Sequence, residues 1–162
     1  MSSFKDRQAA AKLSPPSTIA EIEGFLPHRP PMLMLDRVIS FDETTILAEK
    51  DAPADAFYFQ GHFPGNPIMP GVMIVEAVAQ SGALLCAMNG MFDTDTELLA
   101  FAGVDGAKFR RSVYPGDTLS IETKIVKQRR NLYKFEGSVS VGGARVTTVS
   151  FSAASAPRLP AD

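Results

Sequence analysis

The stretch over residues 61–88 constrains the fold and the chemistry of this chain more than any other. It reads GHFPGNPIMPGVMIVEAVAQSGALLCAM and combines a loop stiffened by prolines with an apolar run that starts at Gly71 and ends at Met88. The run is long enough for about five helical turns. Because its apolar side chains would point in nearly every direction, we expect a helix buried in the domain. A membrane span takes about twenty apolar residues, so we do not expect one here.

This predicted helix carries one charge, Glu76, and Gln80 follows one turn later on the same face. A buried carboxyl group has to be paired, hydrogen-bonded or protonated, so Glu76 is either half of a structural ion pair or a general acid. His62 lies in the rigid loop, and the first amides of the helix, from Gly71 onward, can stabilise an oxyanion. A base, an acid and amide donors so close in sequence favour removal of a proton next to a carbonyl group.

Three segments together resemble the signatures of one family. They are the stretch described above, FLPHRPPMLMLDRV at 25–38 and GVDGAKFRRSVYPGDTL at 103–119. In this order and spacing they are similar to the bacterial (3R)-hydroxyacyl-acyl carrier protein dehydratases, from about Thr18 to Ser152. The resemblance implies an α+β hot-dog fold, in which a curved antiparallel sheet wraps a long central helix. It also implies conversion of a (3R)-3-hydroxyacyl chain on acyl carrier protein to the trans-2-enoyl thioester, with no cofactor.

The resemblance implies a role for each candidate residue of the site. His62 would remove the proton from C2, and Glu76 would protonate the hydroxyl group that leaves C3. The amide of Gly71, helped by that of Phe63, would hold the thioester carbonyl, and Gln80 would orient Glu76. The family forms homodimers, often assembled further into trimers of dimers, and His and Glu of one site come from different subunits.

Some positions separate the subfamilies. A sister enzyme that also isomerises its product has Asp at the position of Glu76 and typically Cys at that of Val72, so we expect no isomerisation here. Ala100 departs from relatives that often have Tyr before Phe101. His28 belongs to the second signature, but the resemblance gives it no chemical role, and a structural place in a turn is the simpler interpretation.

Two other functions stay open for a chain of this pattern. An acyl thioesterase of the same fold would use Glu76 to activate water and would leave His62 unexplained. A noncatalytic acyl-binding protein would need neither residue. We expect no metal site, because His62 has no second His at ligand spacing and Cys86 has no partner.

The remaining sequence predicts a single domain over residues 18–155, between flexible tails at 1–17 and 156–162. A capping box at Thr18 begins a short helix, and Gly142 and Gly143 form a hairpin turn. The chain lacks a signal-like apolar N-terminal stretch, so we expect a cytoplasmic protein. Strands are predicted at 32–41, 44–50, 98–104, 118–125, 134–141 and 146–153.

The charge distribution points to a partner. The net charge of −2 gives no bulk attraction to nucleic acid. Residues 108–130, by contrast, hold seven basic and two acidic side chains. They form either a solvated strand face or a docking patch for an acidic partner, which the resemblance identifies as acyl carrier protein. We name Lys108, Arg110 and Arg111 as candidates for that docking.

Overall fold

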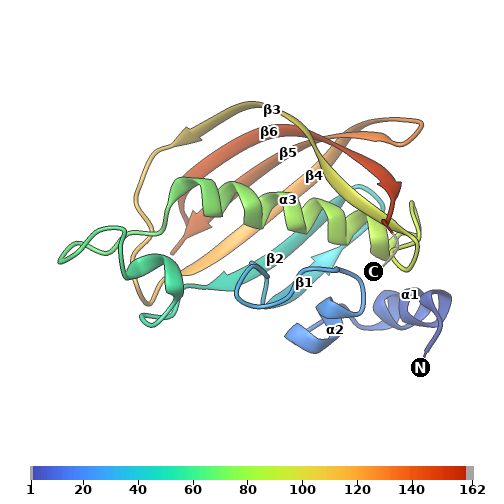
Figure 1. Ribbon diagram of the computed structural model, residues 1–162, viewed down its shortest axis with the longest axis horizontal. Coiled ribbons are helices and arrows are strands. Elements are labelled where there is room, and N and C mark those ends of the chain that lie inside the picture. Colours follow the sequence, from blue (N-terminus) through green and yellow to red (C-terminus); the bar gives the residue numbers. More distant parts are fainter. Residues whose placement is uncertain (1, 160–162) are drawn as a thin grey trace.

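A computed structural model describes residues 2–159, and an antiparallel sheet dominates it (Figure 1). The strands lie in the order β1-β2-β4-β5-β6-β3, and each neighbouring pair is antiparallel. They are β1 (Arg37–Phe41), β2 (Thr45–Asp51), β3 (Glu97–Phe109), β4 (Thr118–Arg129), β5 (Leu132–Val141) and β6 (Ala144–Pro157). The helices are α1 (Phe4–Leu13), α2 (Ile19–Glu23) and α3 (Gly71–Met88), with a 3₁₀ turn over Phe57–Phe59.

Helix α3 lies along the inner face of the curved sheet, which wraps around it (Figure 1). The helix has the bounds that the sequence predicts, and residues 80–88 are buried throughout. It is long and apolar enough to cross a membrane by composition, but 67% of it is buried inside the protein. Its first turns are only partly covered, and the side chain of Val72 is 73% exposed. The central helix is therefore a core element whose N-terminal end faces outward.

Small residues let the helix approach the sheet. At Gly82 of α3 a Cβ atom would come within 3.1 Å of the ring of Phe135 and 3.3 Å of that of Phe151. These rings stack with centroids 4.8 Å apart and form the floor beneath the helix. Ser81 and Thr123 join helix and sheet through a hydroxyl pair at 2.6 Å, which satisfies buried polar groups of both elements.

A matched pair of substitutions tests this close packing. Gly137 of β5 lies beneath Val78, and a Cβ atom there would overlap the Val78 side chain. We expect Gly137→Ala to lower the free energy of unfolding by about 1–3 kcal/mol, because the helix has to shift. Ser138→Ala, on the opposite face of the strand, should change it by less than about 0.5 kcal/mol. Urea denaturation measures both values, and equal losses would contradict the packing described.

The strands confirm the predicted sheet but differ in length from the prediction. Strand β1 begins only at Arg37, because the backbone of Met32 and Met34 bonds to Gln80 of α3 rather than to a neighbouring strand. Strand β3 is 13 residues long, far beyond the predicted 98–104. It forms one edge of the sheet and is exposed over most of its length, so it lacks the apolar alternation by which buried strands are predicted. Gly142 and Gly143 form the predicted turn with φ of 56° and 80°.

The structure places a helix, α1, in the segment predicted as a flexible tail, residues 1–17. Gln8 Nε2 donates a hydrogen bond to the Ala87 carbonyl at 3.0 Å. Arg7 forms an ion pair with Asp95 at 2.8 Å. The helix is thus docked against the far end of α3, and whether it is flexible stays a prediction.

The predicted C-terminal tail, 156–162, also begins inside regular structure, since β6 continues to Pro157. Met1 and residues 160–162 of the two predicted tails lie outside the described residues. The short helix α2 begins, as predicted, at a capping box in which the Thr18 side chain accepts from the Glu21 amide.

Candidate active site

Glu76 opens into a cavity of about 220 Å³ between α3 and strands β3 and β6. Its side chain is 23% exposed, so the carboxyl group is neither free in solvent nor sealed in the core. Seven of the ten lining residues are apolar, and four of these are alanines. The cavity is lined by His28, Glu76, Ala79, Gln80, Ala83, Leu99, Ala100, Phe101, Phe151 and Ala153.

The carboxyl group of Glu76 is held by Gln80, as the sequence predicts. Gln80 Nε2 donates to Glu76 Oε1 at 2.8 Å. The backbone of the turn that precedes β1 also hydrogen-bonds to the Gln80 amide. Gln80 Oε1 accepts from the Met34 amide at 2.7 Å, and Nε2 also donates to the Met32 carbonyl at 2.8 Å. A backbone donor and a backbone acceptor together leave only one orientation of the Gln80 amide.

This clamp determines which oxygen of Glu76 can transfer a proton. Because Gln80 presents an N–H group, Oε1 has to act as an acceptor. When Glu76 is protonated, the proton therefore lies on Oε2. The arrangement suits a general acid that donates from one defined atom.

His62 lies in the loop before α3, which extends beyond the end of the sheet (Figure 1). Its Nδ1 is 2.9 Å from the Ile68 carbonyl, and since a carbonyl oxygen only accepts, Nδ1 carries the hydrogen. In the neutral ring Nε2 is then the basic nitrogen. The loop itself is tied to the domain by a bond from the Met69 amide to the Val113 carbonyl at 2.8 Å. The loop thus holds the His62 ring in a defined orientation, with Nε2 as its basic nitrogen.

The fold does not bring His62 and Glu76 together within one chain. His62 is not part of the wall of the Glu76 cavity. No hydrogen bond or ion pair joins the two side chains, both of which lie in the described part of the chain. Within one chain, therefore, the structure shows no direct contact between these two side chains.

The predicted carbonyl-binding amides differ in availability. The Phe63 amide donates to the Asn66 carbonyl at 3.0 Å, so this donor is already used within the loop. Gly71 begins α3, and the amide of a first helical residue has no acceptor inside the helix. A Cβ atom at Gly71 would come within 2.7 Å of the Phe109 ring. Glycine therefore lets β3 pass close to the helix N-terminus.

His28 also lies at the site, although sequence reasoning gave it no chemical role. Its Nε2 is 3.6 Å from Glu76 Oε1, and 28% of its side chain is exposed. Burial lowers the pKa of His28 below its ordinary value near 6.5, a shift that the nearby Glu76 opposes and Arg29 reinforces. The ring is therefore mainly neutral at pH 7. Its membership of the second signature marks it as a family position, but nothing in that segment indicates its contact with Glu76.

The three candidate docking residues are exposed but do not form one patch. Lys108 and Arg110 line a hollow on the sheet together with Lys124 and Arg145, where acidic side chains also lie. Arg111 faces a different hollow, beside Tyr114. In the part of the chain that the structure describes, none of the three forms an ion pair with an acidic side chain.

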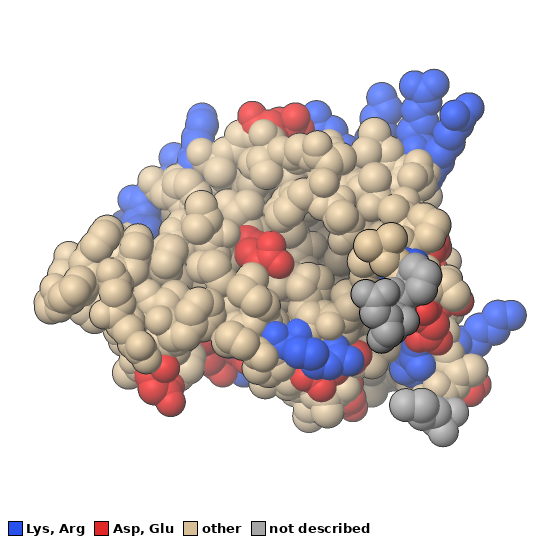
Figure 2. Space-filling view, in the orientation of Figure 1, with Lys and Arg blue, Asp and Glu red and all other residues tan. Residues whose placement is uncertain are grey.

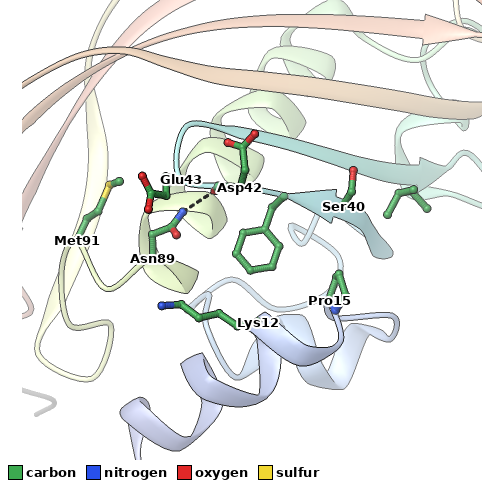
Figure 3. Close-up of a pocket in the computed structure, with 9 residues that line it drawn as sticks. Lys12, Pro15, Ser40, Asp42, Glu43, Asn89 and Met91 are labelled. Carbon is green, nitrogen blue, oxygen red and sulfur yellow. Dashed lines mark hydrogen bonds between the residues drawn. The ribbon is translucent and has the colours of Figure 1, made fainter.

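A larger cavity of about 570 Å³ lies away from the site, between α1 and the hairpin of β1 and β2 (Figure 3). In the wall of this cavity, Asn89 Nδ2 donates to the Asp42 carbonyl at 2.9 Å. Lys12 of α1 also lines the cavity. None of the predicted catalytic residues lines it. Burial raises the pKa of the Cys86 thiol to about 12, so this thiol is not a nucleophile at neutral pH.

Comparison with known proteins assigns the family. Residues 26–150 match the FabA-like domain. The chain is 44% identical over 146 residues to 3-hydroxyacyl-(acyl-carrier-protein) dehydratase FabZ of Yersinia pestis (strain Pestoides F), covering 89% of this chain and 83% of that protein. The chain belongs to the FabZ-type dehydratase family. The corresponding dehydratase of Caulobacter vibrioides (strain NA1000 / CB15N) is 40% identical over 136 residues, covering 83% of this chain and 86% of that protein.

Solved structures confirm the hot-dog fold of this dehydratase. The dehydratase heterocomplex ApeI:P from Xenorhabdus doucetiae superposes with a TM-score of 0.72 at 20% identity, over 82% of this chain and 89% of that one. The PaaI protein of E. coli, from the phenylacetic acid degradation operon, gives a TM-score of 0.60 at 15% identity, over 93% and 91%. At these identities the likeness establishes the α+β fold alone.

Proposed function

We propose that this dehydratase acts on (3R)-3-hydroxyacyl chains carried by acyl carrier protein, with His62 as base and Glu76 as acid. His62 Nε2 takes the proton from C2, the C2–C3 double bond forms and the C3–O bond breaks. The proton on Glu76 Oε2 joins the departing oxygen and gives water. The observation that carries the proposal is the Gln80 clamp, which leaves one oxygen of Glu76 able to donate into an apolar cavity.

We further propose that two copies of the chain form a dimer through β3, so that His62 of one copy meets Glu76 of the other. An uncovered edge strand invites pairing with another strand. Apolar side chains remain exposed on β3 and at the start of α3, among them Phe101, Val104 and Val72. Figure 2 shows that most charged side chains on this face lie near its margins, while its middle is largely uncharged apart from an acidic group near the centre. In such a dimer the symmetry gives two identical sites.

The dimer also explains where substrate binds. One side of the Glu76 cavity belongs to β3, the strand that the partner would cover. This side consists of Leu99, Ala100 and Phe101. The acyl chain would lie along α3 and the sheet, and the Gly71 amide would hold the thioester carbonyl. The Phe63 amide is less suited, because Asn66 occupies it. A trimer of such dimers and a cytoplasmic location belong to the same proposal.

One assay separates this activity from the alternatives. A (3R)-3-hydroxyacyl thioester is incubated with the protein, and enoyl absorbance and free thiol are followed together. We expect the absorbance to rise without release of thiol, because Glu76 protonates a leaving hydroxyl group rather than activating water. Release of thiol at the same rate would indicate a thioesterase. A cis-3-enoyl product, resolved from the trans-2-enoyl product by chromatography, would contradict the absence of isomerisation.

We also propose that Lys108, Arg110 and Arg111 contribute to docking of acyl carrier protein. Reversing all three to Glu should raise KM for the carrier-bound substrate by about tenfold, since exposed charge contacts contribute about 0.5 kcal/mol each. KM for a small thioester mimic should change little. Steady-state kinetics on both substrates gives the comparison.

A matched control uses the same change in charge elsewhere. Lys5, Lys12 and Arg158 are exposed and lie outside the basic window 108–130, two of them on α1 and one after β6. Reversal of these three should leave KM for the carrier substrate nearly unchanged. Equal effects of the two triple variants would show that net charge alone, rather than contacts with Lys108, Arg110 and Arg111, determines KM for the carrier substrate.

A further inference from the structure

His28 is placed against Glu76 by a turn that is fastened from two sides. Arg29 donates from Nη1 to the carbonyls of Leu26 and His28, both at 2.8 Å. On the other side Gln80 binds the backbone of Met32 and Met34. Hydrogen bonds within the turn and to α3 therefore fix its conformation. They place the imidazole of His28 against the helix face that carries Glu76.

The surroundings of His28 indicate which ring nitrogen carries its hydrogen. Nδ1 is buried and has no hydrogen-bond partner, whereas Nε2 lies 3.6 Å from Glu76 Oε1. A buried N–H without an acceptor is rarer in native proteins than an acceptor that lacks a donor. The hydrogen is therefore better placed on Nε2, where it faces the carboxyl group of Glu76. Oε1 then has two N–H groups directed at it, one from Gln80 and one from His28.

We propose that His28 is a positioning residue that, with Gln80, keeps Oε1 of Glu76 as an acceptor and stabilises the carboxylate left when Oε2 gives up its proton. The separation of 3.6 Å is longer than a hydrogen bond, so the contact can tighten as negative charge develops on Glu76. The inference rests on the proposed role of Glu76 as general acid.

The neutral state of His28 matters for this role. A permanent cation beside Oε1 would hold Glu76 as a carboxylate and deprive the site of its acid. The groups that face the ring are Glu76 from α3 and Arg29 from its own turn, and burial opposes a charge on the imidazole. A neutral donor thus assists proton release from Glu76 without preventing its reprotonation.

The test compares two leaving groups. Dehydration of a 3-hydroxyacyl thioester needs a proton on the departing oxygen, whereas a 3-chloroacyl thioester loses chloride and needs none. In both reactions His62 takes the proton from C2 and the C2–C3 double bond forms. We expect His28→Leu to lower kcat for the hydroxy substrate by about 10 to 100-fold, the range for a misplaced catalytic group. Its kcat for the chloro substrate should stay within about threefold of the parent.

Two further variants at position 28 separate a positioning role from a loss of folding. His28→Gln keeps a neutral N–H donor of similar reach and should recover most of kcat for the hydroxy substrate. If His28→Leu does not form a native protein, His28→Met replaces it, since its flexible side chain fills irregular space. Equal losses on both substrates, or a glutamine variant as slow as the leucine variant, would overturn the inference.

The same experiment separates this inference from the proposed function. Glu76→Gln is measured beside the His28 variants. If it dehydrates the hydroxy substrate normally, the role of Glu76 is refuted and the inference about His28 fails with it. If Glu76→Gln is inactive and His28→Leu is fully active, only the inference about His28 is overturned.

Discussion

Replacing either His62 by alanine or Glu76 by glutamine is expected to lower kcat for dehydration by about 10² to 10⁴-fold, with the fold retained. His62 lies in an outer loop, so its truncation leaves the core unchanged. Gln at position 76 keeps an oxygen that accepts from Gln80, and it loses only the transferable proton. Both losses are therefore chemical rather than structural. Steady-state kinetics with a (3R)-3-hydroxyacyl thioester measures them.

A matched control for the glutamate substitution is available on the surface. Glu43→Gln makes the same chemical change in the exposed turn between β1 and β2 and should leave kcat unchanged. Circular dichroism and thermal unfolding check that the inactive variants are native. Near-normal turnover by native His62→Ala or Glu76→Gln would show that the residue is not the acid or base assigned here.

The site was accessible to sequence reasoning where local pattern determines structure. The apolar run predicts the bounds of α3, and a spacing of four residues places Gln80 beside Glu76 on the same helical face. The proline-rich loop predicts that His62 is presented rigidly just before that helix. These features depend on residues close in sequence, so no knowledge of the tertiary fold is needed to expect them.

Other features depend on contacts between distant residues and could not be predicted in this way. His28 meets Glu76 only because Gln80 binds the backbone around Met32 and Met34, and no pattern in the second signature indicates this contact. Helix α1 is a different case, because its capping box at Ser3 and Asp6 is a local signal that the prediction of a flexible tail does not take into account. The length of β3 was underestimated because an exposed edge strand has no apolar alternation.

The most direct test of the account concerns the shared site, since His62 and Glu76 lie apart within one chain. Inactive His62→Ala chains are mixed with inactive Glu76→Gln chains under conditions in which dimers exchange subunits. In a mixed dimer one site receives both substitutions and the other receives neither. With random mixing half of the dimers are mixed, and each of these has one intact site.

Subunit exchange has to be shown independently, for instance by native mass spectrometry of chains that differ in isotope label. Mixing wild-type chains with either inactive variant calibrates the effect of exchange on activity. The measurement is the dehydration rate of the exchanged mixture of the two inactive variants. The account predicts recovery of about a quarter of the wild-type activity. No recovery, with exchange demonstrated, would contradict a site built from His62 of one chain and Glu76 of the other.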